Sequence, residues 1–245
     1  MAPDPPPRRA LLHNGIMKLH LLGLALISLL LIACGGDDAP AATDASPQEL
    51  LAKSATAVQD VTTLHFRLTH ENGTTPMPLN LQLVTAEGDI VLPDRLAAKL
   101  NARAASVSVS LDVIGIADRT WITNPFTRRW QTLPEATIQD VADPAALVAS
   151  LLDSLDNPQV AGSSEIDDVS TVHITGTMDS GALEGALPIA HAGLTVNVDL
   201  WIGEDDSLPR RVRLNGPIAS DDAEKIVRQV DFSDYNARVD IQPPE

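Results

Sequence analysis

The chain has 245 residues, with 33 acidic and 17 basic side chains and a formal net charge of −16. This acidity excludes nucleic acid as an expected partner, because phosphates would be repelled rather than neutralised. It also disfavours a polybasic contact with anionic lipid. A single cysteine leaves no disulfide framework, so stability has to come from one hydrophobic core of ordinary size.

The first 33 residues have the build of a secretory signal. Residues 1–16 are rich in proline and contain basic side chains, and we interpret them as an upstream start, since Met17-Lys18 forms a normal charged n-region. The apolar stretch Leu19–Ala33 is about 15 residues long, which is short of the roughly 20 that a membrane-spanning helix needs. Residues 17–33 are therefore expected to be a lipoprotein signal peptide.

The only cysteine, Cys34, stands where cleavage would make it the first residue. The run Leu31-Ile32-Ala33-Cys34-Gly35 resembles the lipobox of bacterial lipoproteins, in which this cysteine is diacylated. The alternative, a buried free thiol, is disfavoured because the small and polar residues that follow offer no core. We expect a diacylglyceryl anchor on Cys34 that holds the protein on the extracytoplasmic side of a cell-envelope membrane. Residues 34–46 then form the acylated start and a flexible tether.

Helices are predicted where capping signals precede an apolar period of 3.6. Ser46, Pro47 and Glu49 have the spacing of a capping box, which predicts a helix over residues 47–60. A second helix begins at Asp143-Pro144 and is ended by Asn157-Pro158. A weaker helical piece is predicted at 179–187, within one of two long loops placed at 156–170 and 179–192.

Elsewhere the period of the apolar residues changes to two. Such alternation predicts antiparallel strands with one buried and one solvated face. Turn residues separate the strands, and no second linker divides the chain. Residues 47–245 are thus expected to form one α+β domain, with alternating strands at 66–69, 79–83, 107–113, 194–202 and 211–214.

The chain carries no local signature of catalysis, nucleotide binding or metal binding. His65, His70, His173 and His191 are scattered, and the first two would point to opposite faces of a strand. The acidic pairs Asp205-Asp206 and Asp221-Asp222 are interpreted as solvated turns. We expect no enzyme activity, cofactor or metal, although a Ser-His-Asp assembly stays open because its members need only meet in space.

Three further segments have a recognisable order. Residues 121–130 read W-x-x-x-P-x-T-x-x-W, residues 208–213 read LP-x-R-V-R after Trp201, and residues 232–235 read F-S-D-Y. With the lipobox, tether and leucine-rich helix, they resemble the mycobacterial lipoprotein family that includes LppX and LprG, over about 50–245. That family is similar in architecture to the LolA/LolB carriers and RseB-type sensors. The chain departs from it in its acidity and its two long loops.

The resemblance implies a strongly curved antiparallel sheet, a half-barrel, with helices packed over its concave face around a hydrophobic cavity. It also implies a lipoprotein that binds acyl chains of a lipid or glycolipid and carries them between membrane layers. Its expected partners are the membrane, through Cys34, the lipid ligand, and a membrane transporter. The alternative is an envelope sensor or adaptor of the same fold that binds a protein.

The lining of such a cavity would come from the inward-facing apolar series and from one face of the second helix. The same residues suit an ordinary core equally well, so the sequence leaves both interpretations open. The candidates are Leu79, Leu81, Leu83, Val107, Val109, Leu111, Leu147, Leu151, Leu152, Val196, Val198 and Leu200.

Overall fold

The computed structural model describes residues 45–133, 144–187 and 189–245. The predictions for the upstream start, the signal peptide, Cys34 and most of the tether fall outside these residues. Within the described part of the chain, no helix is both long and apolar enough to cross a membrane.

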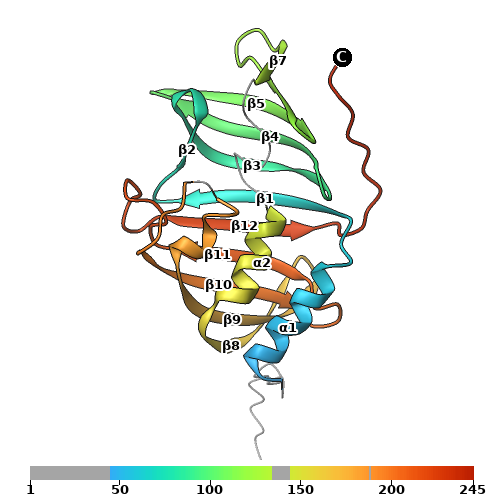
Figure 1. Cartoon of the computed structure of the whole chain (residues 1–245), viewed down its shortest axis with the longest axis vertical. Helices are drawn as coiled ribbons and strands as arrows, with labels where there is room; N and C mark the ends of the chain where they lie inside the picture. The colour runs from blue at the N-terminus through green and yellow to red at the C-terminus, as the bar shows by residue number, and fades with distance from the viewer. Residues whose placement is uncertain (1–44, 134–143, 188) are drawn as a thin grey trace, which may run out of the picture. The chain divides into compact units, whose positions relative to one another are not determined.

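Twelve antiparallel strands form one open sheet (Figure 1). Its order is β7-β6-β5-β4-β3-β1-β12-β11-β10-β9-β8, and the short β2 pairs with β3. The strands are β1 Thr63–Glu71, β2 Thr75–Met77, β3 Leu81–Val91, β4 Arg95–Ala104, β5 Val107–Ile116, β6 Arg119–Thr123, β7 Trp130–Leu133, β8 Asp156–Ile166, β9 Val169–Asp179, β10 Thr195–Gly203, β11 Pro209–Asn215 and β12 Val227–Ser233.

The first and last strands of the chain meet in the middle of the sheet. In the β1–β12 pair, Phe66 lies opposite Phe232 and Leu68 opposite Val230. Strands β1–β7, which we call the N-terminal half, therefore extend to one side of this seam. Strands β8–β12, the C-terminal half, extend to the other.

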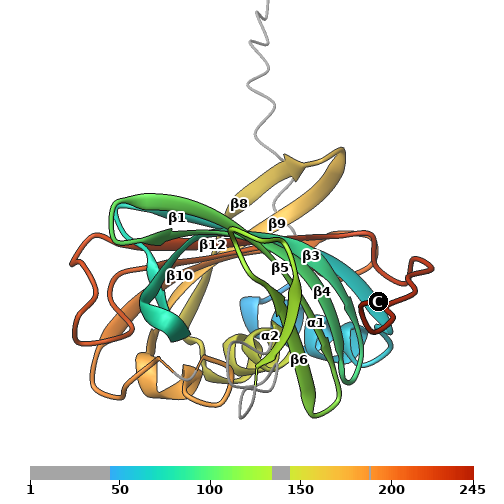
Figure 2. The same cartoon turned by 90° about the horizontal axis from the view of Figure 1, so that it is seen from above.

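Two helices, α1 (Pro47–Val58) and α2 (Pro144–Ser154), lie on the concave side of the curved sheet (Figure 2). The capping box of α1 is confirmed: the Glu49 amide donates to Ser46 Oγ at 3.2 Å and the Ser46 amide donates to Glu49 Oε2 at 2.9 Å. Both helices lie in front of the C-terminal half in Figure 1. The predicted class, a curved antiparallel sheet with helices over its concave face, is confirmed.

Two parts of the secondary structure differ from the prediction. The prediction of a loop at 156–170 is wrong, because this segment forms β8, the turn after it and the start of β9. Register shifts between Asp156 and Gln159 and between Val160 and Gly162 interrupt its alternation, so the period of two is not visible in the sequence. The helical piece predicted at 179–187 is confirmed as a short 3-10 helix, η2 (Ser180–Leu183).

Most of the candidate lining residues are interior residues. Leu79 and Val107 are not: they are 63% and 53% exposed. Leu79 lies in a 3-10 turn, η1 (Pro78–Asn80), with a φ of 65°, and the alternation of β3 begins only at Leu81. Val107 begins β5 at the end of the strands, beyond the covered part of the concave face. The side chain of Leu147 is outside the description; the buried candidates are Leu81, Leu83, Val109, Leu111, Leu151, Leu152, Val196, Val198 and Leu200.

Candidate functional site

The concave face is apolar throughout, but its two halves are covered to different degrees. In the C-terminal half, Val196, Val198 and Leu200 of β10 are 0–1% exposed. In the N-terminal half the exposure varies: Ala98 and Val113 each keep 8% of their surface exposed, while Leu111 keeps 1%. The β10 side chains are therefore fully buried, as in an ordinary core, whereas part of the N-terminal face keeps a slight exposure.

The cover of the C-terminal half comes from α2 and η2. These two elements contact each other, and α2 also contacts α1. Leu151 of α2 and Leu183 of η2 are 1% and 0% exposed, so they belong to the same packed layer as β10. This half of the concave face therefore has the packing that a structural core requires.

The floor of the N-terminal half is built from small and apolar side chains. One row across the strands pairs Phe66 with Gly88, Gly88 with Ala98, Ala98 with Val113 and Val113 with Ile122. A Cβ at Gly88 would lie 2.2 Å from the backbone oxygen of Ala97, so the strands approach too closely there for any side chain. This row of the floor is therefore apolar, and it is low at Gly88 and Ala98.

A polar cluster lies at one end of the concave face, where β1, β2 and β12 meet. Arg228 is 4% exposed, and its terminal nitrogens donate to both oxygens of Asp222 at 3.0 and 2.6 Å. Asp222 was expected to be a solvated turn residue; that expectation is wrong, because its side chain is 2% exposed. The carboxylate also accepts from the amides of Ile218 and Ala219, which explains why it is buried.

His70 extends this cluster. Its Nδ1 lies 2.9 Å from the backbone oxygen of Val84, which can only accept, so Nδ1 carries the proton. Nε2, 2.7 Å from Thr75 Oγ1, then accepts from the hydroxyl, and the hydroxyl oxygen accepts from Arg228 Nε at 3.0 Å. The neutral ring pairs each donor with an acceptor, whereas a second ring proton on Nε2 would have to share Thr75 Oγ1 with Arg228 and would leave the hydroxyl proton without its acceptor.

Stability is expected to fall through His70 as the pH is lowered through the ordinary histidine range around 6.5. Burial lowers the pKa of His70, and the charge of Arg228 lowers it further, against the opposing effects of Val84 and Asp222. The unfolded chain binds a proton near the ordinary histidine pKa of 6.5 and the folded chain does not, so stability rises with pH in this window. Thermal unfolding of His70→Gln should lack this dependence. The exposed His191→Gln should retain it; equal pH profiles of His70→Gln and the native chain would contradict the assignment.

Two of the other histidines lie on the convex face of the sheet. His65 pairs with Asp89 at 2.8 Å, on the opposite face from His70 as predicted, and His173 pairs with Asp199 at 2.8 Å while stacking on Trp201. In the described ranges no group of three or more His, Cys, Asp or Glu could hold a metal ion. The concave N-terminal half is thus the feature of the fold that most resembles a binding site.

Comparison with known proteins agrees with this fold. Residues 46–241 match the model of the LppX_LprAFG lipoprotein family. The chain belongs to this family. Among curated proteins, none matches the sequence.

Two solved members of LppX_LprAFG type share the fold. LprF from Mycobacterium bovis matches with a TM-score of 0.64 and 17% identity, covering 81% of this chain and 96% of its own. LppX from Mycobacterium tuberculosis matches with a TM-score of 0.58 and 20% identity, covering 80% and 98%. A LolA superfamily protein from Nitrosomonas europaea matches only distantly, with a TM-score of 0.28 and 13% identity over 80% and 94% of the two chains.

These coverages also define a folding unit. The solved LprF and LppX chains consist almost entirely of the part that matches this chain. The matched range, 46–241, also contains the described core of the sheet. A soluble protein that begins after Cys34 is therefore a suitable subject for experiments.

Proposed function

We propose that this lipoprotein binds the acyl chains of a lipid or glycolipid against the concave face of its N-terminal half and carries them between membrane layers. Membership of the lipoprotein family supports a role in the cell envelope. The observation that carries the proposal is the contrast between the two halves: helices lie over one, and in the apolar floor of the other Ala98 and Val113 retain slight exposure.

The physical requirement is shelter from water. Each CH₂ group moved out of water is worth about 0.8 kcal/mol, so a long acyl chain needs on the order of 10 kcal/mol of apolar contact. The inner-facing side chains of β3, β4 and β5 are Leu, Val, Ala, Ile and Gly, and their positions bear no charge. Such a surface favours an acyl chain and offers no group for covalent chemistry, which supports carriage rather than catalysis.

The membrane attachment belongs to the same proposal. Cys34 would carry the diacylglyceryl anchor, and residues 35–46 would tether the domain to the membrane. A flexible tether of this length spans on the order of 20 Å on average. The domain could then reach lipids in its own membrane while its concave face stays in the aqueous space between layers.

Native mass spectrometry of the soluble protein, residues 36–245, tests the proposal. After expression in a lipid-rich bacterial host, we expect an adduct of lipid mass that solvent releases and fragmentation identifies. A clean mass without adduct, before and after incubation with host lipid extract, would reject lipid binding. That result would favour the alternative, an envelope sensor of the same fold that binds a protein.

A further inference from the structure

Among the described residues, three large hydrophobic side chains are exposed, and all three lie in the N-terminal half. They are Leu79 at 63%, Val107 at 53% and Phe126 at 79%. Single exposed hydrophobic residues are common on protein surfaces and need no explanation. Three of them gathered on one edge would be a patch of a kind that marks an interaction site.

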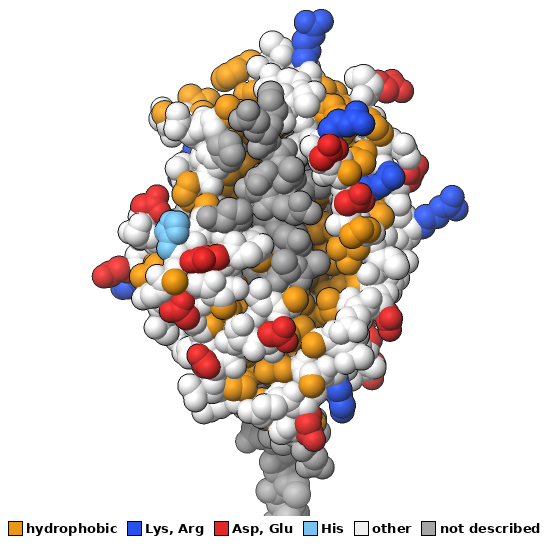
Figure 3. Space-filling model, viewed as in Figure 1, with side chains coloured by type: hydrophobic (Ala, Val, Ile, Leu, Met, Phe, Trp, Pro, Cys, Tyr) orange, Lys and Arg blue, Asp and Glu red, His pale blue; other side chains and the backbone are white. Residues whose placement is uncertain are grey.

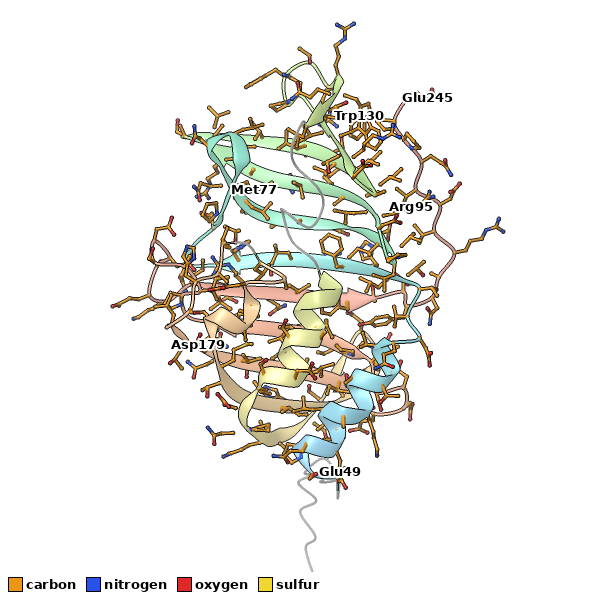
Figure 4. The ribbon with its side chains drawn as sticks, in the orientation of Figure 1. Glu49, Met77, Arg95, Trp130, Asp179 and Glu245 are labelled. Carbon is orange, nitrogen blue, oxygen red and sulfur yellow. The ribbon has the colours of Figure 1, made fainter. Side chains whose placement is uncertain are left out.

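The topology places them on the same edge. Leu79 lies between β2 and β3, Val107 follows the turn between β4 and β5, and Phe126 lies in the turn between β6 and β7. Connections of an antiparallel sheet alternate between its two ends, so these three lie at one end and the β3–β4 and β5–β6 turns lie at the other. Figure 4 shows the two ends through Met77, next to Leu79, and Arg95, at the start of β4.

The pairing register confirms how near they are. Met77 pairs with Leu81, Leu81 with Ala104 and Ala104 with Val107, which places η1 beside the β4–β5 turn. The β6–β7 turn is fastened to the middle of β5, because Arg128 donates to the Ser110 backbone oxygen at 3.1 Å. Ser110 lies three residues along the strand from Val107, a distance of roughly 10 Å.

The Phe126 turn is held in a defined shape. Asn124 Oδ1 accepts from the amides of Phe126 and Thr127, each at 3.0 Å. The Asn124 amide donates to the Arg129 oxygen at 2.8 Å, and the Arg128 amide donates to the Asn124 oxygen at 2.9 Å. These four hydrogen bonds fix the shape of the turn. The exposure of the Phe126 ring is therefore a property of an ordered turn.

The charge of this edge is opposite to that of the whole chain. Residues 74–84, 100–111 and 119–134 contain no acidic residue, although the chain has 33. They contain the exposed arginines Arg103 and Arg129, and also Arg128, whose charge is balanced by Asp112 of β5 at 2.5 Å. Figure 3 shows hydrophobic side chains at the upper left of the molecule, over the ends of β2 to β5.

We propose that this edge, formed by Leu79, Val107 and Phe126 with the flanking arginines, docks the domain onto the surface of a lipid bilayer with anionic headgroups. We call it the docking edge. Side chains of Leu, Val and Phe gain free energy from burial at the acyl boundary, and arginines nearby gain from anionic headgroups. Docking requires no lipid cargo, so this proposal can be tested independently of the proposed function.

The acidity of the chain does not prevent this contact. At physiological salt, charges more than about 8 Å from a surface are largely screened, so the local arginines outweigh distant carboxylates. Met77 and Ala104, which are half-buried against the core, connect the docking edge to the interior of the N-terminal half. A bilayer held at this edge would thus lie at the end of the apolar floor, which is where an acyl chain would have to enter or leave.

Flotation of the soluble protein, residues 36–245, with vesicles of equal parts phosphatidylglycerol and phosphatidylcholine tests the docking edge. We expect Phe126→Ser to weaken binding about tenfold, which corresponds to partial burial of one phenyl ring. Arg129→Gln should weaken binding to these vesicles about fivefold and leave binding to pure phosphatidylcholine unchanged. Arg238→Gln, an exposed arginine of the C-terminal segment, is the matched control and should bind like the native protein.

Several outcomes would overturn the docking edge. Native protein that does not float with the anionic vesicles contradicts it directly. So does binding that is equal in the native protein, Phe126→Ser and Arg129→Gln, or binding that Arg238→Gln weakens as much as Arg129→Gln. Arg129→Gln is a second, independent variant, so the test does not depend on the folding of Phe126→Ser. Lipid adducts of each variant in native mass spectra show separately whether lipid cargo is bound.

Discussion

Replacing Asp222 by alanine is expected to lower the free energy of unfolding by about 3 to 5 kcal/mol. The Arg228 guanidinium is 4% exposed and has both terminal nitrogens on the Asp222 carboxylate. Without that carboxylate, a buried cation loses its partner, and the amides of Ile218 and Ala219 lose their acceptor. An uncompensated buried charge is far more costly than a lost surface contact, which is why this effect is large.

Urea unfolding of the soluble protein measures the effect. The double variant Asp222→Ala with Arg228→Met should regain much of the loss, because it removes the stranded charge as well. Glu87→Ala is the matched control: it breaks a pair with Arg67 in which the side chains are 51% and 58% exposed, and it should cost no more than about 1 kcal/mol. Equal costs for Asp222→Ala and Glu87→Ala would show that the buried pair does not stabilise the fold.

The Asp222 carboxylate also makes the stability of the protein depend on pH in the acid range. Burial alone would raise the pKa of Asp222, but the hydrogen bonds from Arg228 and from the Ile218 and Ala219 amides outweigh it, so the pKa is lowered from 3.8. The stabilisation is complete above the unfolded value and is lost as the pH falls through the lower, folded value. The native protein should therefore show a loss of stability below about pH 4 that the double variant lacks.

Ala98→Phe is expected to lower the lipid affinity on the order of 50-fold while changing the free energy of unfolding by less than about 1 kcal/mol. The added ring occupies the place of about three CH₂ groups of an acyl chain, each worth about 0.8 kcal/mol. Ala98 lies in the middle of the apolar floor and retains 8% exposure. If an acyl chain lies there, a phenyl ring can take its place without disturbing the sheet.

Val198→Phe supplies the comparison. Val198 is 1% exposed in the closed C-terminal half, so a larger side chain should overpack it and cost about 1 to 3 kcal/mol. The lipid content of its folded fraction should stay unchanged. Native mass spectra and urea unfolding of both variants separate the two halves. If Ala98→Phe loses stability like Val198→Phe and keeps its lipid, the N-terminal half is packed and does not hold an acyl chain.

The two proposals assign related roles to the N-terminal half, acyl-chain binding and bilayer docking. Its floor would receive acyl chains, and its docking edge would rest on the bilayer from which they come or to which they go. The closed C-terminal half would supply the stability that a partly empty domain needs, because its β10 side chains are fully packed under α2 and η2. The buried Arg228–Asp222 pair lies near the seam of the halves and fastens the loop before β12 to β2.

Several elements followed from the sequence alone. Ser46, Pro47 and Glu49 were sufficient to predict where α1 begins, because a capping box satisfies backbone amides within one turn and needs no distant partner. Alternation likewise predicted β5, β10 and β11, since each has one covered face. By contrast, β4 reads as a good helix former, rich in Ala, Lys, Leu and Arg. It is a strand because β3 and β5 pair with it on both sides.

The sequence by itself determined which residues face inward along most strands, and its ordered motifs carried the resemblance from which the curvature of the sheet was expected. Only the tertiary structure decided what lies above those residues. Val109 and Val198 occupy equivalent places in alternating strands, yet they keep 8% and 1% exposure, and Leu111, two residues from Val109 on the same face, keeps 1%. Leu79 and Val107 fit the alternation in the sequence, but in the fold no described segment covers them and their side chains are exposed. The period of a strand records the direction of its side chains, whereas burial depends on segments that reach them from far along the chain.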